Sequence, residues 1–301
     1  MRISDASSQQ QVTLFTLQAR DRFAAQQAKI ASGKHQIRRS EDPRQAAAAS
    51  QAATALETLE RRRELLDTAS YSQTQTEASL TSILDTVQRL RELVVSANDG
   101  TKSTADRQSM AEEVDSLLES LVALGNRQVD GNYLFAGESG QQPIQVTRTG
   151  DRLTAATVSN SVVTAVRLEE GIRLPLGAVA GGDGGVFANA GTDYDLLNRT
   201  IVLRDRLAAG ELPTEDDLTY LDQGLHETTG AVVMSGIDKQ RLESIGSQLS
   251  SLELGERTRL EGLTSLDMST AVIELNRLQV TYQASLQMAA NVQRLSMVQF
   301  I

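Results

Sequence analysis

The sequence predicts a mainly α-helical protein with a small β-rich insertion, in which the N- and C-terminal halves pair as a long antiparallel helical bundle or coiled coil. Three observations support this fold class. Apolar residues recur at steps of three and four over long stretches of the 301-residue chain. Proline occurs only four times, which permits long uninterrupted helices. A segment rich in Thr, Val and Gly, about residues 133–191, separates the two helical halves.

The first segment, residues 1–40, is rich in Gln, Ala and Ser and has few large apolar side chains. Phe23, Ile30 and Ile37 stand seven residues apart, which places them on one stripe of a helix. Because this stripe is narrow, the helix would be marginal in isolation. A break follows at residues 40–43, Ser-Glu-Asp-Pro, because proline disfavours the helical conformation before it and fits the first turn of a new helix.

Two further helices are expected before the β-rich segment. The first runs from about Arg44 to Asn98, where Asn-Asp-Gly supplies residues typical of a helix end. The second begins near Ser103 or Thr104 and runs toward Asp130-Gly131. The longer helix carries the clearest coiled-coil seam of the chain, formed by Leu80, Ile83, Val87, Leu90 and Val94.

The segment 133–191 is expected to be a small β-rich insertion. Residues 144–147 and 162–166 read as short strands, since they are rich in Val, Ile and Thr and are followed by Gly-containing turns. The run Gly-Gly-Asp-Gly-Gly at 181–185 lacks the strand–turn–helix context of a dinucleotide site. It is interpreted as a hinge or an exposed flexible loop.

Helical periodicity returns at about Asp193. Thr214 and Asp217 resemble a capping box after Pro213, at the start of a long helix. A last helix is expected from about Asp267 to Phe300. Its seam mixes large and small residues, which allows close helix approach, and consists of Ala271, Leu275, Leu278, Tyr282, Ser285, Ala289 and Val292.

These elements predict three parts. Residues 1–40 and 268–301 form terminal coiled-coil helices, residues 41–132 and 192–267 form a helical bundle domain, and residues 133–191 form a β-rich outer domain. Neither terminal helix buries enough apolar surface alone to offset the entropy lost on ordering it. We therefore expect the two ends to pair with each other and with further helical subunits.

Composition excludes several functional classes. The net charge of −10 disfavours nucleic-acid binding, although residues 1–40 are net basic and form either a solvated face or a partner-binding strip. The absence of cysteine removes disulfides and thiolate catalysis. The sequence has no run of about 20 consecutive apolar residues, so no transmembrane helix is expected. The first 20 residues lack the apolar core of a cleaved secretory signal.

Catalytic, cofactor-binding and metal-ligating motifs are also missing from the sequence. The two histidines, His35 and His226, lie far apart and show no zinc-type spacing, which favours structural or solvent-facing roles. Ser32-Gly33-Lys34 is not a phosphate-binding loop, because Ala28 stands where the upstream glycine is needed and His35 replaces the hydroxyl residue. The sequence thus predicts a non-enzymatic protein without cofactor or metal.

Three segments together resemble the flagellin-like hook–filament junction (FlgL) family. The first is Ile30 to Lys34 with Ile37 and residues 40–43, the second is Tyr133-Leu-Phe-Ala-Gly137, and the third lies in the last helix. Their order and their distances from the chain ends agree with the family pattern. The signature residues carried by this resemblance are Ser32, Gly33, Asp42, Pro43, Leu134, Phe135, Ala136, Gly137, Gln283, Ala284 and Ser285.

The resemblance implies a structural adaptor of the bacterial flagellum, outside the cell, that joins the hook to the filament. It implies export through the flagellar type III apparatus without a cleaved signal, and assembly as a ring between the first hook-associated protein and flagellin. It also implies an export chaperone that shields the C-terminal helix. The stripes and the resemblance together suggest intersubunit packing positions at Phe23, Ile30, Ile37, Leu275, Leu278, Tyr282 and Val292.

Three alternatives remain open from the residues. The chain could be flagellin itself, although its Leu-Phe-Ala-Gly segment and small central domain favour the junction protein. A signalling coiled coil would share the Ala-, Ser- and Gln-rich helices but should lack the β-rich insertion. An enzyme with its site in the β-rich segment would need convergent acid, base or metal ligands there, and only Glu169, Glu170 and Asp183 are present.

Overall fold

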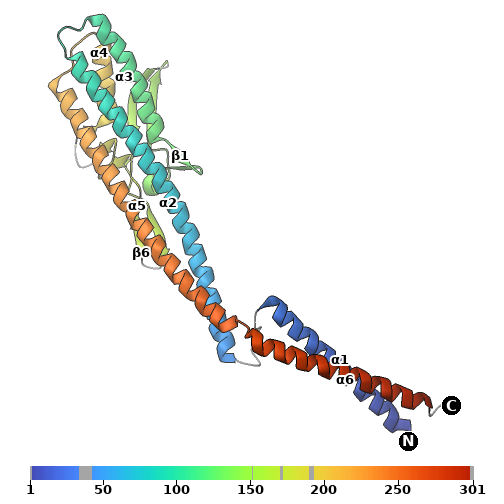
Figure 1. Ribbon diagram of the computed structural model, residues 1–301. Helices are drawn as coiled ribbons and strands as arrows, with labels where there is room; N and C mark the ends of the chain where they lie inside the picture. The colour runs from blue at the N-terminus through green and yellow to red at the C-terminus, as the bar shows by residue number, and fades with distance from the viewer. Residues whose placement is uncertain (1, 34–42, 151, 170–171, 190–192, 299–301) are drawn as a thin grey trace. The chain divides into compact units, whose positions relative to one another are not determined.

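The computed structural model describes residues 2–33, 43–150, 152–169, 172–189 and 193–298. Long helices from both ends of the sequence and short strands between them confirm the predicted fold class (Figure 1). The contacts within the chain group into two compact units. We call residues 1–59 and 251–301 the terminal unit and residues 60–250 the central unit. The finer three-part division remains a prediction.

The terminal unit is built around a pair of helices from the two ends of the chain. Helix α1 (Arg2–Ser32) and helix α6 (Met268–Val298) lie side by side (Figure 1). The pair is antiparallel, because the Thr16 hydroxyl donates to the carbonyl of Ser285 (3.4 Å) and the Gln26 amide donates to the carbonyl of Ala271 (3.1 Å). The unit also contains the start of α2 (Pro43–Ala97) and the end of α5 (Glu215–Thr264).

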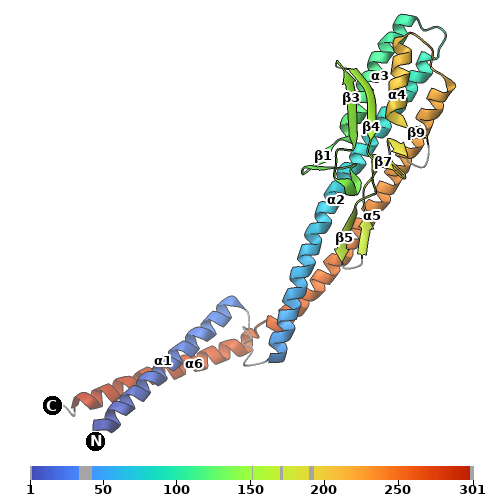
Figure 2. The same ribbon diagram turned by 180° about the vertical axis from the view of Figure 1, so that it is seen from behind.

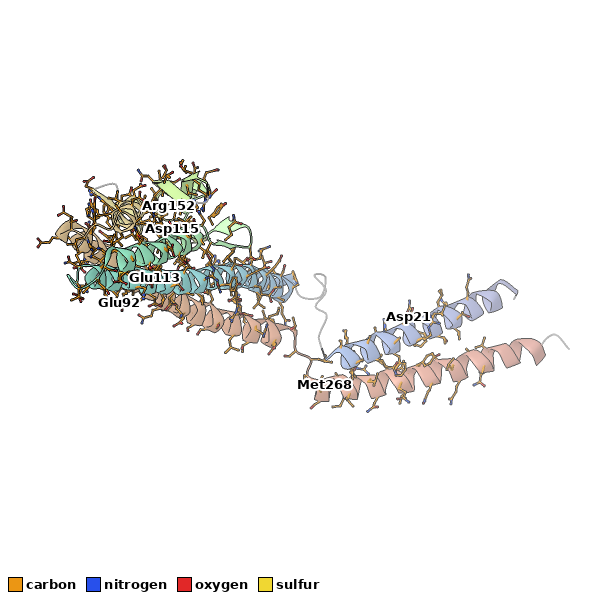
Figure 3. The ribbon with its side chains drawn as sticks, turned by 90° about the horizontal axis from the view of Figure 1, so that it is seen from above. Asp21, Glu92, Glu113, Asp115, Arg152 and Met268 are labelled. Carbon is orange, nitrogen blue, oxygen red and sulfur yellow. The ribbon has the colours of Figure 1, made fainter. Side chains whose placement is uncertain are left out.

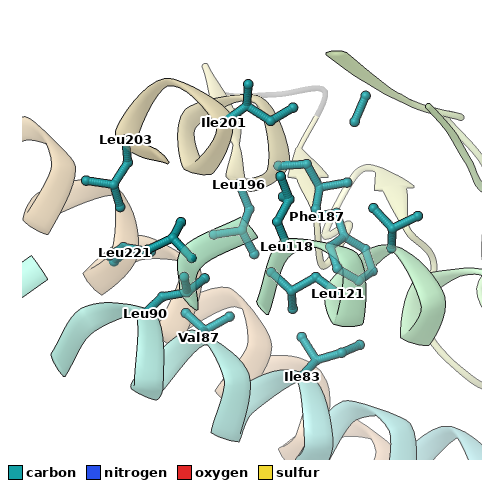
Figure 4. Packing of buried hydrophobic residues seen from close by; sticks show 14 of the residues in the cluster. Ile83, Val87, Leu90, Leu118, Leu121, Phe187, Leu196, Ile201, Leu203 and Leu221 are labelled. Atoms are coloured by element: carbon teal, nitrogen blue, oxygen red, sulfur yellow. The ribbon is translucent and has the colours of Figure 1, made fainter. Parts of the chain in front are cut away.

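In the central unit, α2 and α5 pack with α3 (Thr104–Gly125) and α4 (Leu196–Ala208) around one apolar core (Figure 4). Leu118 and Leu121 of α3 and Leu196 of α4 are completely or almost completely buried there. Burial of one such side chain stabilises the fold by about 1.5–3 kcal/mol. The predicted seam is confirmed, since the exposed fraction is 0% for Leu80, Ile83, Val87, Leu90 and Val94.

The predicted extension of α3 toward Asp130-Gly131 is wrong. The helix ends at Gly125, and Asn126 caps it with its backbone N–H. A hairpin follows, in which Asp130 (φ 50°) and Gly131 (φ 81°) form the turn in the left-handed region. Two consecutive positive φ angles match the twist of a tight hairpin, and Asp-Gly is a preferred sequence for that turn. The preference of Asp130-Gly131 for a tight turn therefore outweighs the tendency of the preceding segment to continue as a helix.

The strands form small sheets on one side of the helices (Figure 2). Strand β3 pairs antiparallel with β4, β5 pairs antiparallel with β6, and a three-stranded sheet has the order β7-β8-β9 with β7 and β8 parallel. The strand predicted at 162–166 begins only at Ala165. The bounds are β1 Gln128–Val129, β2 Asn132–Tyr133, a 3-10 turn η1 Gly137–Ser139, β3 Ile144–Thr149, β4 Arg152–Val158, β5 Ala165–Glu169, β6 Ile172–Pro175, β7 Gly181–Gly182, β8 Ala188–Asn189 and β9 Tyr194–Asp195.

Two asparagine side chains attach the β3–β4 hairpin to the helices. Asn126 donates to the carbonyl of Ile144 (2.8 Å) and accepts from its N–H (2.9 Å). Asn198 of α4 does the same with Ala156, at 2.7 and 2.9 Å. Each side-chain amide thus hydrogen-bonds to the hairpin as a peptide group of a neighbouring strand would.

The glycine run at 181–185 is not the exposed loop that the sequence predicts. Gly181, Gly182 and Gly185 are buried, and the first two form β7. Gly182 has φ +110°, and a Cβ atom there would lie 2.5 Å from the carbonyl oxygen of Ser161. The glycines therefore permit close backbone packing within the central unit.

Candidate assembly surface

Most of the predicted packing residues lie on one face of each terminal helix. Phe23 of α1 stacks on Tyr282 of α6, with ring centroids 6.2 Å apart and an interplanar angle of 15°. Ile30 shares the α1 face of Phe23 and of the buried Ala19, and is itself half-buried. On α6, half-buried residues follow the same face as the buried Ala271 and Ser285, namely Leu275, Leu278, Tyr282 and Val292.

The structure therefore brings Phe23 and Tyr282 together between α1 and α6 of one chain, and places the other residues along the same seam. Ile37 lies outside the described residues. Whether any of these positions also contacts another subunit remains a prediction. Within the chain, the seam lets two narrow apolar stripes cover each other, which neither helix could do alone.

A second set of large apolar side chains lies on the solvent-facing parts of the same helices. Ile273 is 69% exposed, Val280 65%, Met288 61% and Leu14 57%. Such a concentration on two paired helices marks an interaction surface, because water-exposed apolar side chains gain from burial. We call these side chains the outer apolar residues, and they are Leu14, Phe15, Leu17, Met268, Val272, Ile273, Val280, Leu286 and Met288.

Three of the outer apolar residues line one open groove between the two helices. Leu14 and Phe15 of α1 and Met288 of α6 line it, together with Gln11, Val12, Gln18 and Ser285. In the side-chain view, Asp21 marks the middle of α1 and Met268 the start of α6 (Figure 3). Both chain ends thus contribute to this groove. The sequence analysis does not predict it, because apolar spacing does not show which apolar side chains the chain itself covers. The signal was present, since Ile273 and Val280 are seven residues apart.

The N-terminal signature residues form helix boundaries. Gly33 adopts φ +64° directly after α1, its N–H donates to the carbonyl of Ile30 (3.2 Å), and its own carbonyl accepts from the N–H of Leu266 (3.3 Å). A left-handed glycine is a common way to end a helix. The Ser32 hydroxyl donates to the carbonyl of Lys29 (3.0 Å), and Pro43 is the first residue of α2, where it needs no N–H partner. Asp42 lies outside the described residues.

The middle signature, residues 134–137, packs against other segments of the central unit. The ring of Phe135 is 1% exposed and meets Phe187 edge-to-face, with centroids 6.4 Å apart. Leu134 is half-buried and Ala136 is buried. At Gly137 (φ +57°) a Cβ atom would lie 2.2 Å from the carbonyl oxygen of Val162. These residues are thus explained by packing.

In the C-terminal signature, Gln283 and Ala284 are exposed and Ser285 is buried in the seam. The Ser285 hydroxyl donates to the carbonyl of Tyr282, at 2.7 Å. A small residue there allows α1 to approach closely, as the contact between Thr16 and the Ser285 carbonyl shows. Gln283 and Ala284 belong to the accessible surface of α6.

Buried titratable groups of the described residues have structural partners. The Tyr194 hydroxyl donates to the carbonyl of Val186 (3.0 Å), and burial raises the pKa of that hydroxyl. Burial also raises the pKa of Asp238, and a hydrogen bond from the backbone N–H of Gly177 partly offsets this rise. His226 is exposed on α5, whereas His35 lies outside the described residues. Across the described parts of the chain, no three His, Cys, Asp or Glu side chains gather as a metal site would need.

Asp267 stabilises the start of α6. Its carboxylate accepts from the hydroxyl of Thr270 (2.6 Å) and from the N–H groups of Ser269 (2.9 Å) and Thr270 (3.3 Å). These hydrogen bonds, with the Thr270 hydroxyl first, hold the pKa of Asp267 below its ordinary range. The carboxylate thus serves as the N-cap of α6.

Acidification is expected to fray the first turn of α6. Because the pKa of Asp267 is lower in the folded chain than in the unfolded chain, its contribution is complete above the unfolded value and is lost as the pH falls through the folded one, that is below about pH 4. NMR Cα shifts of residues 268–271 should lose helical character over that range. Asp267→Ala should show the frayed shifts at neutral pH too, and an unchanged first turn in that variant would contradict the capping role.

Comparisons with known proteins agree with this architecture. Residues 3–140 match the bacterial flagellin N-terminal helical region family. The flagellar hook-associated protein 3 of Escherichia coli K12 is 26% identical over 258 residues, which cover 74% of this chain and 75% of that protein. Flagellin 1 of Proteus mirabilis is 37% identical over 81 residues, or 27% of this chain and 22% of that protein.

Solved structures show the same fold. A Vibrio parahaemolyticus protein assigned as a flagellar hook-associated protein has a TM-score of 0.64 and 16% identity, covering 75% of this chain and 100% of that chain. Bacillus cereus FlgL has a TM-score of 0.55 and 18% identity, covering 70% and 99%. By its N-terminal half and its fold, the chain is similar to flagellin-like structural proteins. Among these proteins, the chain is similar in sequence to a hook-associated protein 3 over about three quarters of both chains, 74% and 75%.

Proposed function

We propose that this chain is a structural adaptor that joins the flagellar hook, through the first hook-associated protein, to the flagellin filament. The observation that carries the proposal is the set of outer apolar residues on the paired terminal helices. Ile273 and Val280 are 69% and 65% exposed on one helix, where they do not stabilise the monomer. In a subunit whose ends pack against neighbouring subunits, these side chains would be buried. The role is mechanical and needs no catalytic group.

Hydrophobic burial supplies the driving force for such an assembly. Fully burying a Val, Leu, Ile, Phe or Met side chain contributes about 1.5–3 kcal/mol. Because the outer apolar residues are already partly buried, each gains only part of that amount, and together their burial is of the same order as the cost of fixing one subunit against its neighbours, about 4–15 kcal/mol. The partners we infer are flagellin, the first hook-associated protein and further copies of this chain in a ring.

The seam residues keep a separate role in this proposal. Phe23, Ile30 and Tyr282 lie between the two ends of one chain, so that α1 and α6 stay side by side with their outer apolar residues exposed. Intersubunit contacts of the seam, including Ile37, Leu275, Leu278 and Val292, are a further part of the proposal. A symmetric ring is consistent with one surface that meets a different surface on the next copy.

The extracellular location and the export route also belong to the proposal. The chain has no cysteine, so no disulfide could hinder passage of an unfolded chain through a narrow channel. None of the helices in the described residues has the length and hydropathy to cross a lipid bilayer. Before assembly, the exposed apolar side chains of α6 would need cover, and an export chaperone that binds the C-terminal helix would provide it.

The adaptor role is favoured over that of a filament subunit. The match to a hook-associated protein 3 extends over about three quarters of both chains, 74% and 75%, whereas the flagellin match covers 27% of this chain. A signalling coiled coil is disfavoured by the β-rich part of the central unit.

Deletion of the gene in its own bacterium tests the proposal. Cells should still build hooks, but should release flagellin into the medium instead of forming attached filaments. Electron microscopy and immunoblotting of the culture supernatant measure both effects, and the wild-type gene on a plasmid should restore filaments. Normal attached filaments in the deletion strain would refute the adaptor role, and loss of the hooks themselves would place the protein earlier in assembly.

A further inference from the structure

A cleft in the central unit lies between α2 and the β1–β2 hairpin. Tyr71 and Ser72 of α2 line one wall, and Asn132 and Tyr133 of the hairpin line another. The cleft encloses about 320 Å³. That volume lies at the lower end of the range for small-molecule sites. It fits a ligand of one or two small rings.

Two aromatic side chains face this cleft from different elements. Tyr71 is 54% exposed, and Tyr133 is half-buried. An exposed Tyr ring offers an apolar face and a polar hydroxyl at low entropic cost, and this combination is favoured at binding surfaces. The C–H face of a sugar ring is a flat apolar surface surrounded by hydroxyls, so it matches such a ring in both respects.

The hydrogen-bonding groups at the mouth of the cleft are unused. The side chains of Tyr71, Asn132, Tyr133 and Asp130 make no hydrogen bond to any described residue of the chain. By contrast, the deeper Gln73 amide donates to the hydroxyl of Ser235 (2.8 Å) and to its carbonyl (3.1 Å). The floor is therefore fixed by bonds within the fold, while donors and acceptors at the mouth remain available for a polar ligand.

The charge of the lining limits the kind of ligand. Among the described residues, no Lys, Arg or His lines the cleft, and Asp130 has the one acidic side chain there. An anion would meet no cationic partner and would be repelled by that carboxylate. Hydroxyls, amides and one carboxylate instead suit the vicinal hydroxyls of an uncharged sugar, because the hydroxyls and amides can donate and accept and the carboxylate can accept.

We propose that this cleft binds a neutral carbohydrate of one or two rings, stacked on Tyr71 and hydrogen-bonded by Asn132. The site is separate from the terminal helices, and the proposal does not depend on the adaptor function. It would give the central unit a ligand-binding role in addition to its structural one.

Saturation-transfer NMR on the full-length protein tests the proposal with glucose, galactose, N-acetylglucosamine and maltose as probes. At least one should show transfer to its ring C–H protons. Tyr71→Ala and Asn132→Ala should each lower the affinity for that probe about tenfold, which is the effect of losing one stacking or hydrogen-bonding contact. Tyr71→Phe should retain most of the binding, because it keeps the ring.

Leu65→Ala is the matched control, since Leu65 is 51% exposed on the same helix but does not line the cleft. It should bind the probe like the wild type, and far-UV circular dichroism should show that every variant remains folded. Absence of transfer to all four sugars at millimolar concentration would overturn the proposal. So would binding that is insensitive to both Tyr71→Ala and Asn132→Ala, or a preference for glucuronate over glucose.

Discussion

Replacing Ile273 with Glu should abolish incorporation of the chain into flagella without unfolding the isolated protein. The Ile273 side chain is 69% exposed on α6, so a carboxylate there remains hydrated in the monomer and should change its stability by no more than about 0.5 kcal/mol. In an assembly that covers this face, the same charge would be buried without a partner, at a cost of several kcal/mol. Swimming assays and electron microscopy of complemented deletion cells measure the outcome.

Val162→Glu is a matched control for this variant, because Val162 is equally exposed, at 69%, but lies in the central unit. It should support motility, and Ile273→Glu should not. Circular dichroism and thermal melting of both purified proteins should coincide with the wild type. Normal filaments on cells that carry Ile273→Glu would show that this face of α6 is not an assembly contact.

The seam can be tested in the same cells with Tyr282→Ala. The wild-type ring stacks on Phe23 within the chain, so its loss should reduce the helical signal of the monomer as well as incorporation. Ile273→Glu should reduce incorporation alone. If Tyr282→Ala kept full helicity and still failed to assemble, the intersubunit role predicted for the seam would gain direct support.

The contrast between these two faces shows what the sequence could predict. Helical periodicity predicts the seam of α2 correctly. Helix α2 buries one apolar face, which includes Leu80, Val87 and Leu90, and the rest of its surface is polar. In α6 it identified one seam from Ala271 to Val292. The helix has a second apolar face with Ile273 and Val280, and periodicity does not indicate which of two faces the chain itself covers.

The β-rich part was predicted in kind but not in detail. The sequence predicts a helix that continues to Asp130-Gly131, because the hairpin strands have only two residues each and are too short to show an alternating pattern. The buried position of Gly182 was missed for a related reason. A glycine run looks the same whether its backbone is exposed or packed against another segment, and the close approach to Ser161 is a tertiary contact.

Asp115→Ala should destabilise the central unit more than Arg204→Met, although Arg204 is the more deeply buried partner. The Arg204 guanidinium is 1% exposed and contacts Asp115 at 2.5 Å and Asp205 at 2.8 Å. Removing Asp115, whose side chain is 32% exposed, leaves the buried cation with one partner that it shares with Arg152. Breaking a buried ion pair in this way should cost about 2–3 kcal/mol in the free energy of unfolding.

Arg204→Met removes the buried charge and retains an apolar stem of similar length. It leaves Asp115 and Asp205, which are 32% and 53% exposed and can be hydrated. Asp205 also keeps its contact with Arg152, at 3.2 Å. The cost should therefore be below about 1 kcal/mol. Urea unfolding of both variants and of the double variant, monitored by circular dichroism, gives the comparison.

The double variant decides between an electrostatic and a packing role. If the buried cation is the source of the penalty, Asp115→Ala should cost little once Arg204→Met is present, with a coupling energy of about 1–2 kcal/mol. If Arg204 acts mainly through its aliphatic stem, the two costs should add, and Arg204→Met should be the more harmful change. Additive costs would therefore show that α3 and α4 are joined by packing, and that the ion pair only satisfies a charge that the fold happens to bury.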